Sequence, residues 1–189
     1  ELKLPLDAPI VGIPATLRPV KGHLFFIKAI PEILKQIPNC HFIFSGKIES
    51  PFSLSIINQL KHYTWKSQCH FLGEIQSMEH FYNASDLLCV PSRSESFGRV
   101  VIEAFAMGKP VIGTAVGGIP EIISDGVDGI LVRYGDVSEL SCAVKRLLLD
   151  ENYRIKLSSK ARNKAQEEYS DPIYRSKITT QINQTLHSI

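Results

Sequence analysis

Two glutamates separated by seven residues, Glu95 and Glu103, are the side chains of this sequence with the clearest potential for ligand chemistry. Glu95 lies in a polar segment that ends at Gly98. Glu103 lies in the apolar run 99–107, which we expect to form a short helix inside the protein. Because a carboxylate in a buried helix is costly without a partner, we expect Glu103 to face a ligand with hydroxyl groups. The alternative is an ion pair with Arg99, one turn earlier.

Two cations, Arg18 and Lys21, follow the first apolar run and precede Gly22, where a helix is expected to begin. Positive side chains beside the free N–H groups of a helix start suit phosphates. The alternative is a pair of solvated loop charges. Neither a Gly-x4-Gly-Lys-Ser/Thr sequence nor a Gly-x-Gly-x-x-Gly sequence after the first strand is present, which disfavours ATP hydrolysis and a nicotinamide dehydrogenase.

The segment 95–98 is expected to place free backbone N–H groups at the start of the helix that carries Glu103. Such groups favour a phosphate or developing negative charge. Two carboxylates and a phosphate site together indicate a sugar nucleotide, with Glu103 on a ribose and Glu95 on the transferred sugar. His23 and His80 are candidate acid–base groups, but we interpret both as surface histidines. Three phenylalanines are assigned to the core instead of to stacking on a ligand: Phe25, Phe26 and Phe105.

The elements that must position these residues are continuous apolar runs alternating with segments of helical periodicity. Strands are expected at 10–15, 41–46, 69–73, 86–90, 110–114 and 130–133. Helices are expected at 24–36, 53–63, 78–84, 99–107, from about 117, and at 137–149, 153–169 and 173–186. This alternation predicts an α/β fold, a Rossmann-like doubly wound parallel sheet of about six strands with helices on both faces.

Ligands of doubly wound folds bind beyond the carboxyl ends of the strands. Six residues of interest for ligand binding come directly after a predicted strand, so we expect them to share one edge of the sheet. These residues are Arg18, Lys21, Gly46, Ile75, Glu95 and Gly117.

The 189 residues, 44% of them hydrophobic, predict one globular domain over 10–170, with a linker at 1–9 and a helix within 171–189. The net charge of +2 does not favour nucleic acid as a partner. The four cysteines form no metal-binding pattern, and we interpret them as reduced, buried thiols of a cytoplasmic protein. We expect no signal peptide, and the sequence shows no apolar stretch of membrane-spanning length. Its opening without Met indicates a piece of a longer protein.

These motifs resemble the C-terminal, donor-binding domain of the GT-B glycosyltransferases, specifically the retaining family called glycosyl transferases group 1, or family four. The pattern that carries the resemblance is Glu95, seven residues, then Glu103, within the segments 94–98 and 103–112 and followed by 117–121. Segments 18–23 and 125–132 also match. The resemblance therefore extends over roughly residues 10 to 165.

The resemblance implies a role for each matching residue. Lys21, beside Gly22, would contact the diphosphate of a nucleotide sugar, and Glu103 would contact the ribose hydroxyls. The turn 73–75, with Ile75, would line the base pocket. The resemblance implies that Lys21 and Glu95 are the catalytic residues of a transfer on the front face of the sugar. It implies no cofactor and no metal, and the sequence has no metal-binding Asp-x-Asp motif. The sugar and its phosphate would be bound by Glu95 and by the backbone of Ser96, Phe97 and Gly98.

One position departs from the family pattern, which often has Arg five residues before the phosphate-binding Lys. Thr16 occupies that position here, and we expect Arg18 to reach the diphosphate instead. An acceptor saccharide or lipid-linked saccharide would be held mainly by an N-terminal domain outside this sequence, toward which the helix 173–186 would pack.

The resemblance places the whole protein in polysaccharide or glycolipid synthesis, with a peripheral membrane contact. The isolated domain would bind nucleotide weakly and be inactive. Two alternatives are half of a sugar-nucleotide epimerase and a non-catalytic nucleotide-binding domain.

Overall fold

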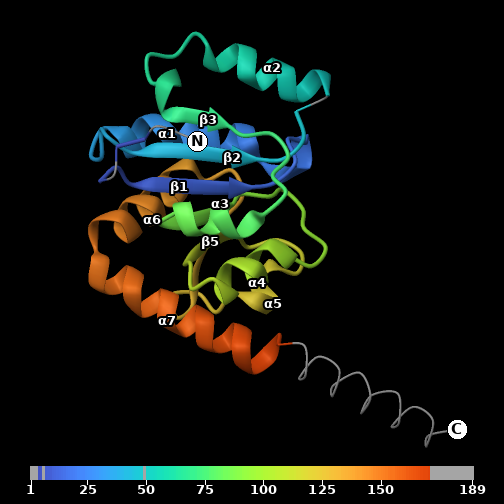
Figure 1. The fold of residues 1–189 in the computed structure, drawn as a ribbon, viewed down its shortest axis with the longest axis vertical. Coiled ribbons are helices and arrows are strands. Elements are labelled where there is room, and N and C mark those ends of the chain that lie inside the picture. Colours follow the sequence, from blue (N-terminus) through green and yellow to red (C-terminus); the bar gives the residue numbers. More distant parts are fainter. Residues whose placement is uncertain (1–3, 6, 49, 171–189) are drawn as a thin grey trace, which may run out of the picture.

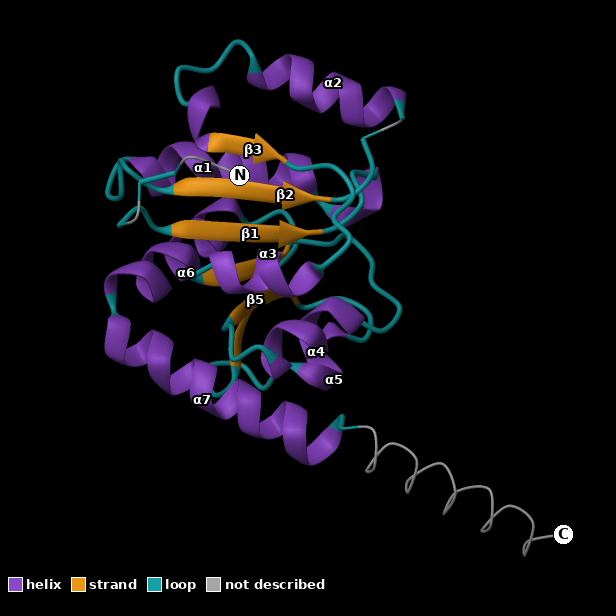
Figure 2. Cartoon of the chain, in the orientation of Figure 1, coloured by secondary structure: helices purple, strands orange, loops and turns teal. Residues whose placement is uncertain are grey.

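The computed structural model describes residues 4–5, 7–48 and 50–170. Its sheet contains six parallel strands in the order β3-β2-β1-β4-β5-β6. The arrows of β1, β2 and β3 point to the same edge in Figure 2. The order confirms the predicted doubly wound topology, because the chain first builds outward from β1 in one direction and then in the other. The strands are β1 (Ile10–Pro14), β2 (His41–Ser45), β3 (Cys69–Phe71), β4 (Leu87–Val90), β5 (Val111–Thr114) and β6 (Gly129–Val132).

Helices cover both faces of this sheet, as predicted. Figure 1 shows α2 beyond the β3 edge of the sheet and α7 at the opposite end. Two short 3-10 helices span Pro19–Lys21 and Lys66–Gln68. The α-helices are α1 (His23–Leu34), α2 (Pro51–Leu60), α3 (Met78–Ala84), α4 (Arg99–Ala106), α5 (Ile119–Ile122), α6 (Val137–Leu149) and α7 (Glu151–Glu168).

The core consists of two apolar clusters, one on each face of the sheet. Along β2, Phe42 and Phe44 join the cluster beneath α1 and α6, whereas Ile43 joins the cluster beneath α3 and α4. The four central strands, β1, β2, β4 and β5, bury both sets of their alternating side chains, which explains why they are apolar throughout. Phe25, Phe26 and Phe105 are buried, as the sequence predicts.

The expectation that the helix 99–107 is buried on all sides is wrong. Only Val101, Ala104 and Phe105 of α4 are buried, while Glu103 is half-buried and Ala106 is exposed. The buried residues pack on the sheet and on α7, and the opposite side of the helix lies at the rim of the sheet. Composition alone showed the apolar character of α4 but not its position at an edge.

The four cysteines are free thiols, but only Cys40 and Cys89 are buried. Cys69 is half-buried, and Cys142 is exposed on the outer side of α6, which corrects the prediction of four buried thiols. Within the described ranges, no helix has the length and apolar character needed to cross a bilayer. The predicted helix 173–186 lies outside the described residues, and the proposed limits of the linker and the domain stay predictions.

Candidate functional site

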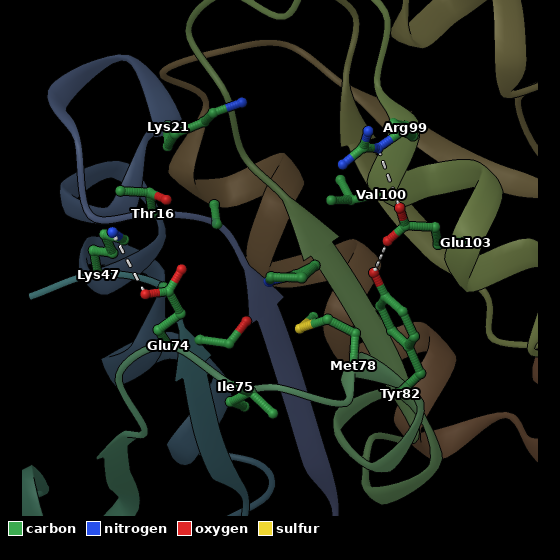
Figure 3. A pocket seen from close by; sticks show the side chains of 14 residues that line it. Thr16, Lys21, Lys47, Glu74, Ile75, Met78, Tyr82, Arg99, Val100 and Glu103 are labelled. Atoms are coloured by element: carbon green, nitrogen blue, oxygen red, sulfur yellow. Dashed lines mark hydrogen bonds and ion pairs between the residues drawn. The ribbon is translucent and has the colours of Figure 1, made fainter.

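A cavity of about 420 Å³ opens at the carboxyl ends of β1 and β2 and extends to α4, which follows β4. The order of the strands reverses between β1 and β4. This is the position at which doubly wound folds bind their ligands. Its walls come from the segments after β1, β2 and β3 and from helices α3 and α4 (Figure 3). Side chains that are remote in sequence therefore converge on one space, as the strand-end argument predicts.

Lys21 and Glu103 line this cavity together, although they are 82 positions apart in the sequence. Lys21 ends the 3-10 helix after β1, and Glu103 lies in the second turn of α4. In Figure 3 the two side chains extend from different elements on opposite sides of the space. A site with a cation at one side and a carboxylate at the other can bind a ligand that carries both phosphate and hydroxyl groups.

Glu103 is held by two neighbours. The Tyr82 hydroxyl donates a hydrogen bond of 2.6 Å to Oε2 of Glu103, and Nε of Arg99 lies 3.3 Å from Oε1. The alternative of an Arg99 ion pair is therefore present, but it coexists with a position on the cavity wall. The Arg99 side chain is 85% exposed, so this ion pair adds little stability. Burial, reinforced by the Glu103 carboxylate, raises the pKa of Tyr82 well above its ordinary value, so its hydroxyl stays protonated.

Lys21 pairs with Glu95. Its Nζ atom lies 2.6 Å from Oε2 of Glu95, and the Ser92 hydroxyl donates to the same oxygen at 3.4 Å. Both partners are largely shielded from solvent. The backbone supports the approach of the two segments, because the Arg93 N–H donates to the Val20 carbonyl at 2.7 Å. The loop after β4 is thereby joined to the segment after β1.

Two glycines allow the loop after β4 to lie close to its neighbours. Gly22 has φ 71° and Gly117 has φ 54°, a region that side chains other than glycine rarely adopt. A Cβ atom on Gly22 would overlap the Pro91 carbonyl, and one on Gly117 would overlap the Glu95 carbonyl. Gly118 donates its N–H to that Glu95 carbonyl at 3.0 Å. These contacts fix the backbone on which Glu95 stands.

The predicted site residues occupy different positions relative to the cavity. Lys21, Ile75 and Glu103 line it directly. Glu95 does not line the cavity, but it forms an ion pair with Lys21, which does. The remaining predicted residues lie around this centre, with Arg18, Ser96 and Phe97 exposed and Gly22 and Gly98 buried.

The start of α4 has the free donors that the sequence predicts. Gly98 precedes the helix with φ 90°, and no side chain caps it. Within the described part of the chain, the N–H groups of Ser96, Phe97 and Gly98 make no hydrogen bond. These groups are available to an anion at the helix start.

Several lining residues were not singled out as site residues from the sequence. Tyr82 belongs to an apolar stripe of α3, but a tyrosine in such a stripe needs a partner for its hydroxyl, and that requirement was the available signal. Lys47 and Glu74 approach within 3.5 Å at one end of the cavity, and both are exposed. The other lining residues of this group are Pro14, Ala15, Thr16, Ser45, Met78, Arg99 and Val100.

The interpretation of His23 as a surface histidine is wrong, whereas His80 is exposed as predicted. His23 is fully buried, and its Nε2 atom lies 3.2 Å from the Ala15 carbonyl, to which it must donate. The Arg18 carbonyl lies near the ring but outside hydrogen-bond geometry, so Nδ1 is without a partner among the described residues. Burial lowers the pKa of His23 from 6.5 to about 4, although the two carbonyls oppose the shift. The ring is therefore a neutral support for the segment between β1 and Lys21.

The fold and the cavity define a Rossmann-like domain of the GT-B architecture. Residues 1–164 match the family model described as "Glycosyl transferases group 1", and the chain belongs to this family. It is 31% identical over 175 residues to D-inositol 3-phosphate glycosyltransferase from Corynebacterium aurimucosum, covering 88% of this chain and 41% of that relative. The chain thus spans about two fifths of that protein.

Solved structures agree with this assignment. The Anabaena protein Alr3699/HepE in complex with UDP-glucose is 27% identical, with a TM-score of 0.84 over 97% of this chain and 50% of that one. The C-terminal domain of the group 1 glycosyl transferase LpcC from Francisella tularensis is also 27% identical, with a TM-score of 0.77 over 86% of this chain and 87% of that one. The chain therefore corresponds to the C-terminal domain of a GT-B glycosyltransferase.

Proposed function

We propose that this domain binds the nucleoside diphosphate sugar donor of a glycosyltransferase that transfers the sugar with retention, in polysaccharide or glycolipid synthesis. The observation that carries the proposal is the joint presence of Lys21 and Glu103 in one cavity at the strand-order reversal. The solved relative that holds UDP-glucose supports the same ligand class. The acceptor would be bound mainly by an N-terminal domain.

The proposal gives each part of the donor a position. The diphosphate lies near Lys21 and the free N–H groups before α4, because an ammonium and helix N–H groups both favour phosphate oxygens. The ribose donates its hydroxyls to Glu103, and the base extends toward Ile75. The transferred sugar lies toward Glu95, beside the start of α4.

Departure of the diphosphate concentrates negative charge on its oxygens. Lys21, which lines the cavity, would stabilise that charge, and the N–H groups of Ser96, Phe97 and Gly98 would add to this because they have no backbone partner in the described part of the structure. Glu95 is already paired with Lys21 and is therefore a poor covalent nucleophile. This arrangement favours displacement on the front face of the sugar, in which Glu95 orients the sugar.

The proposal is tested by calorimetric titration of the chain with UDP, GDP, ADP and pyrophosphate. We expect one nucleoside diphosphate to bind more tightly than pyrophosphate, because the ribose and the base add contacts that pyrophosphate cannot make. A Glu79→Gln variant, which changes an exposed carboxylate at the start of α3, is the matched control and should bind like the wild type. Binding of none of the three nucleotides, by either the chain or the longer protein, would overturn the proposal.

A further inference from the structure

The hydroxyl of Tyr82 donates a short hydrogen bond to Glu103, with 2.6 Å between the hydroxyl oxygen and Oε2. Tyr82 is only 2% exposed and belongs to the apolar cluster on the α4 side of the sheet, where its ring lies edge-on to Phe81 with centroids 6.1 Å apart. The ring is therefore fixed by packing. Figure 3 shows the tyrosine extending from α3 toward the carboxylate on α4.

Glu103 needs such a fixed donor because its side chain is 39% exposed and otherwise has several rotamers available. Arg99 contacts the other carboxylate oxygen at 3.3 Å, but it is itself 85% exposed and cannot hold the group in one orientation. A carboxylate has about four lone-pair sites. Tyr82 uses one site on Oε2, and Arg99 makes an ion pair with Oε1, so each oxygen keeps at least one site for a ligand hydroxyl.

We propose that Tyr82 is a positioning residue that orients Glu103 so that both of its oxygens accept from the two vicinal hydroxyls of the donor ribose. The inference rests on the proposed function and adds to it a residue outside the Glu95–Glu103 motif. It predicts that Tyr82 contributes to nucleotide binding only when those ribose hydroxyls are present. A residue that merely supports the fold would affect every ligand equally.

The test compares wild type and Tyr82→Phe, which removes the hydroxyl and keeps the packed ring. The probes are the nucleoside diphosphate that the wild type binds most tightly among UDP, GDP and ADP, and its 2′,3′-dideoxy counterpart. We expect the variant to lose about tenfold in affinity for the ribose nucleotide, since a hydrogen bond to a charged group is removed. We expect the affinity for the dideoxy nucleotide to change less than about twofold.

Two further variants complete the test. Arg99→Gln should lose less than about threefold in affinity for the ribose nucleotide, because the contact between Arg99 and Glu103 is exposed. In a Glu103→Ala background, Tyr82→Phe should have no additional effect, because Tyr82 acts only through Glu103. Equal losses for both nucleotides, or an unchanged affinity for the ribose nucleotide, would overturn the role of Tyr82. If the wild type bound no nucleotide, the proposed function itself would fail, which is a different result.

Discussion

Lys21 and Glu95, which come from the loops after β1 and β4, form an ion pair of 2.6 Å at the edge of the candidate donor site. The pair joins the residue proposed to hold the diphosphate to the residue proposed to hold the sugar. An ammonium bonded to a carboxylate has fewer protons to offer a phosphate. The two halves of the donor site are therefore expected to influence each other.

Replacement of Glu95 by Gln should affect two ligands in opposite directions. Loss of the carboxylate charge frees Lys21, so affinity for the bare nucleoside diphosphate should rise, by up to about threefold. Affinity for the matching nucleotide sugar should fall, because the sugar loses an acceptor. Titrations at low and moderate salt measure both. Equal losses for the two ligands would contradict this division of roles, and Glu79→Gln serves as the charge-matched control.

Removal of the Arg18 side chain tests whether it replaces the arginine missing at Thr16. Arg18 is exposed and does not line the cavity, so its contact with a diphosphate requires the side chain to extend over the rim. We expect Arg18→Ala to weaken nucleoside diphosphate binding by about threefold, the effect of one exposed charge. Arg162→Ala, an exposed arginine of α7, is the control. Unchanged binding in Arg18→Ala would refute the compensation.

The stability of the domain should depend on pH through His23. Its folded pKa of about 4 lies below its ordinary value of 6.5, so the unfolded chain binds more protons between these values. The resulting stability is present above pH 6.5 and is lost as pH falls toward 4, with a total on the order of 3 kcal/mol. Urea unfolding between pH 4.5 and 7.5 measures this change. His23→Gln should show a flatter dependence, and an unaltered pH dependence would show that His23 is not its source.

A methyl group on Gly117 should displace the loop that carries Glu95. Gly117→Ala forces a left-handed backbone on alanine and places Cβ against the Glu95 carbonyl, so we expect a loss of about 2 kcal/mol or more in the free energy of unfolding. Gly135→Ala is the control, because that glycine has φ 91° but no neighbour within 4 Å of its added Cβ. The control should show the backbone cost alone. Identical losses in the two variants would mean that the contact with Glu95 has no effect.

The strand-and-helix order and the shared edge were predictable because parallel strands with two buried faces leave continuous apolar runs, and their ends mark the site. Lys21 and Ile75 were found in this way, whereas Glu103 was found as a carboxylate within an otherwise apolar helix. The burial of His23 was not predictable, because it depends on the Ala15 carbonyl and on packing near Phe44, which the local sequence does not reveal.

The remaining errors have the same origin in tertiary contacts. The prediction that α4 is buried inside the protein was wrong because an apolar helix at the rim of a sheet has the same composition as one in its centre. Tyr82 was missed because its apolar neighbours hide a hydroxyl whose partner lies on another helix. Local sequence thus indicates which side chains are available, whereas packing decides which pairs meet.

The most direct test of the central claim, that one cavity holds both ends of a nucleoside diphosphate, is a titration of two variants with three ligands. Lys21→Met and Glu103→Ala are each titrated with the preferred nucleoside diphosphate, its nucleoside and pyrophosphate, with exposed Lys28→Met as a control. We predict that Lys21→Met loses at least about tenfold in affinity for the nucleoside diphosphate and for pyrophosphate but binds the nucleoside as the wild type does. Glu103→Ala should bind the nucleoside and the nucleoside diphosphate more weakly but bind pyrophosphate as the wild type does. If the two variants lost all three ligands equally, or lost none, the account of this site would be contradicted.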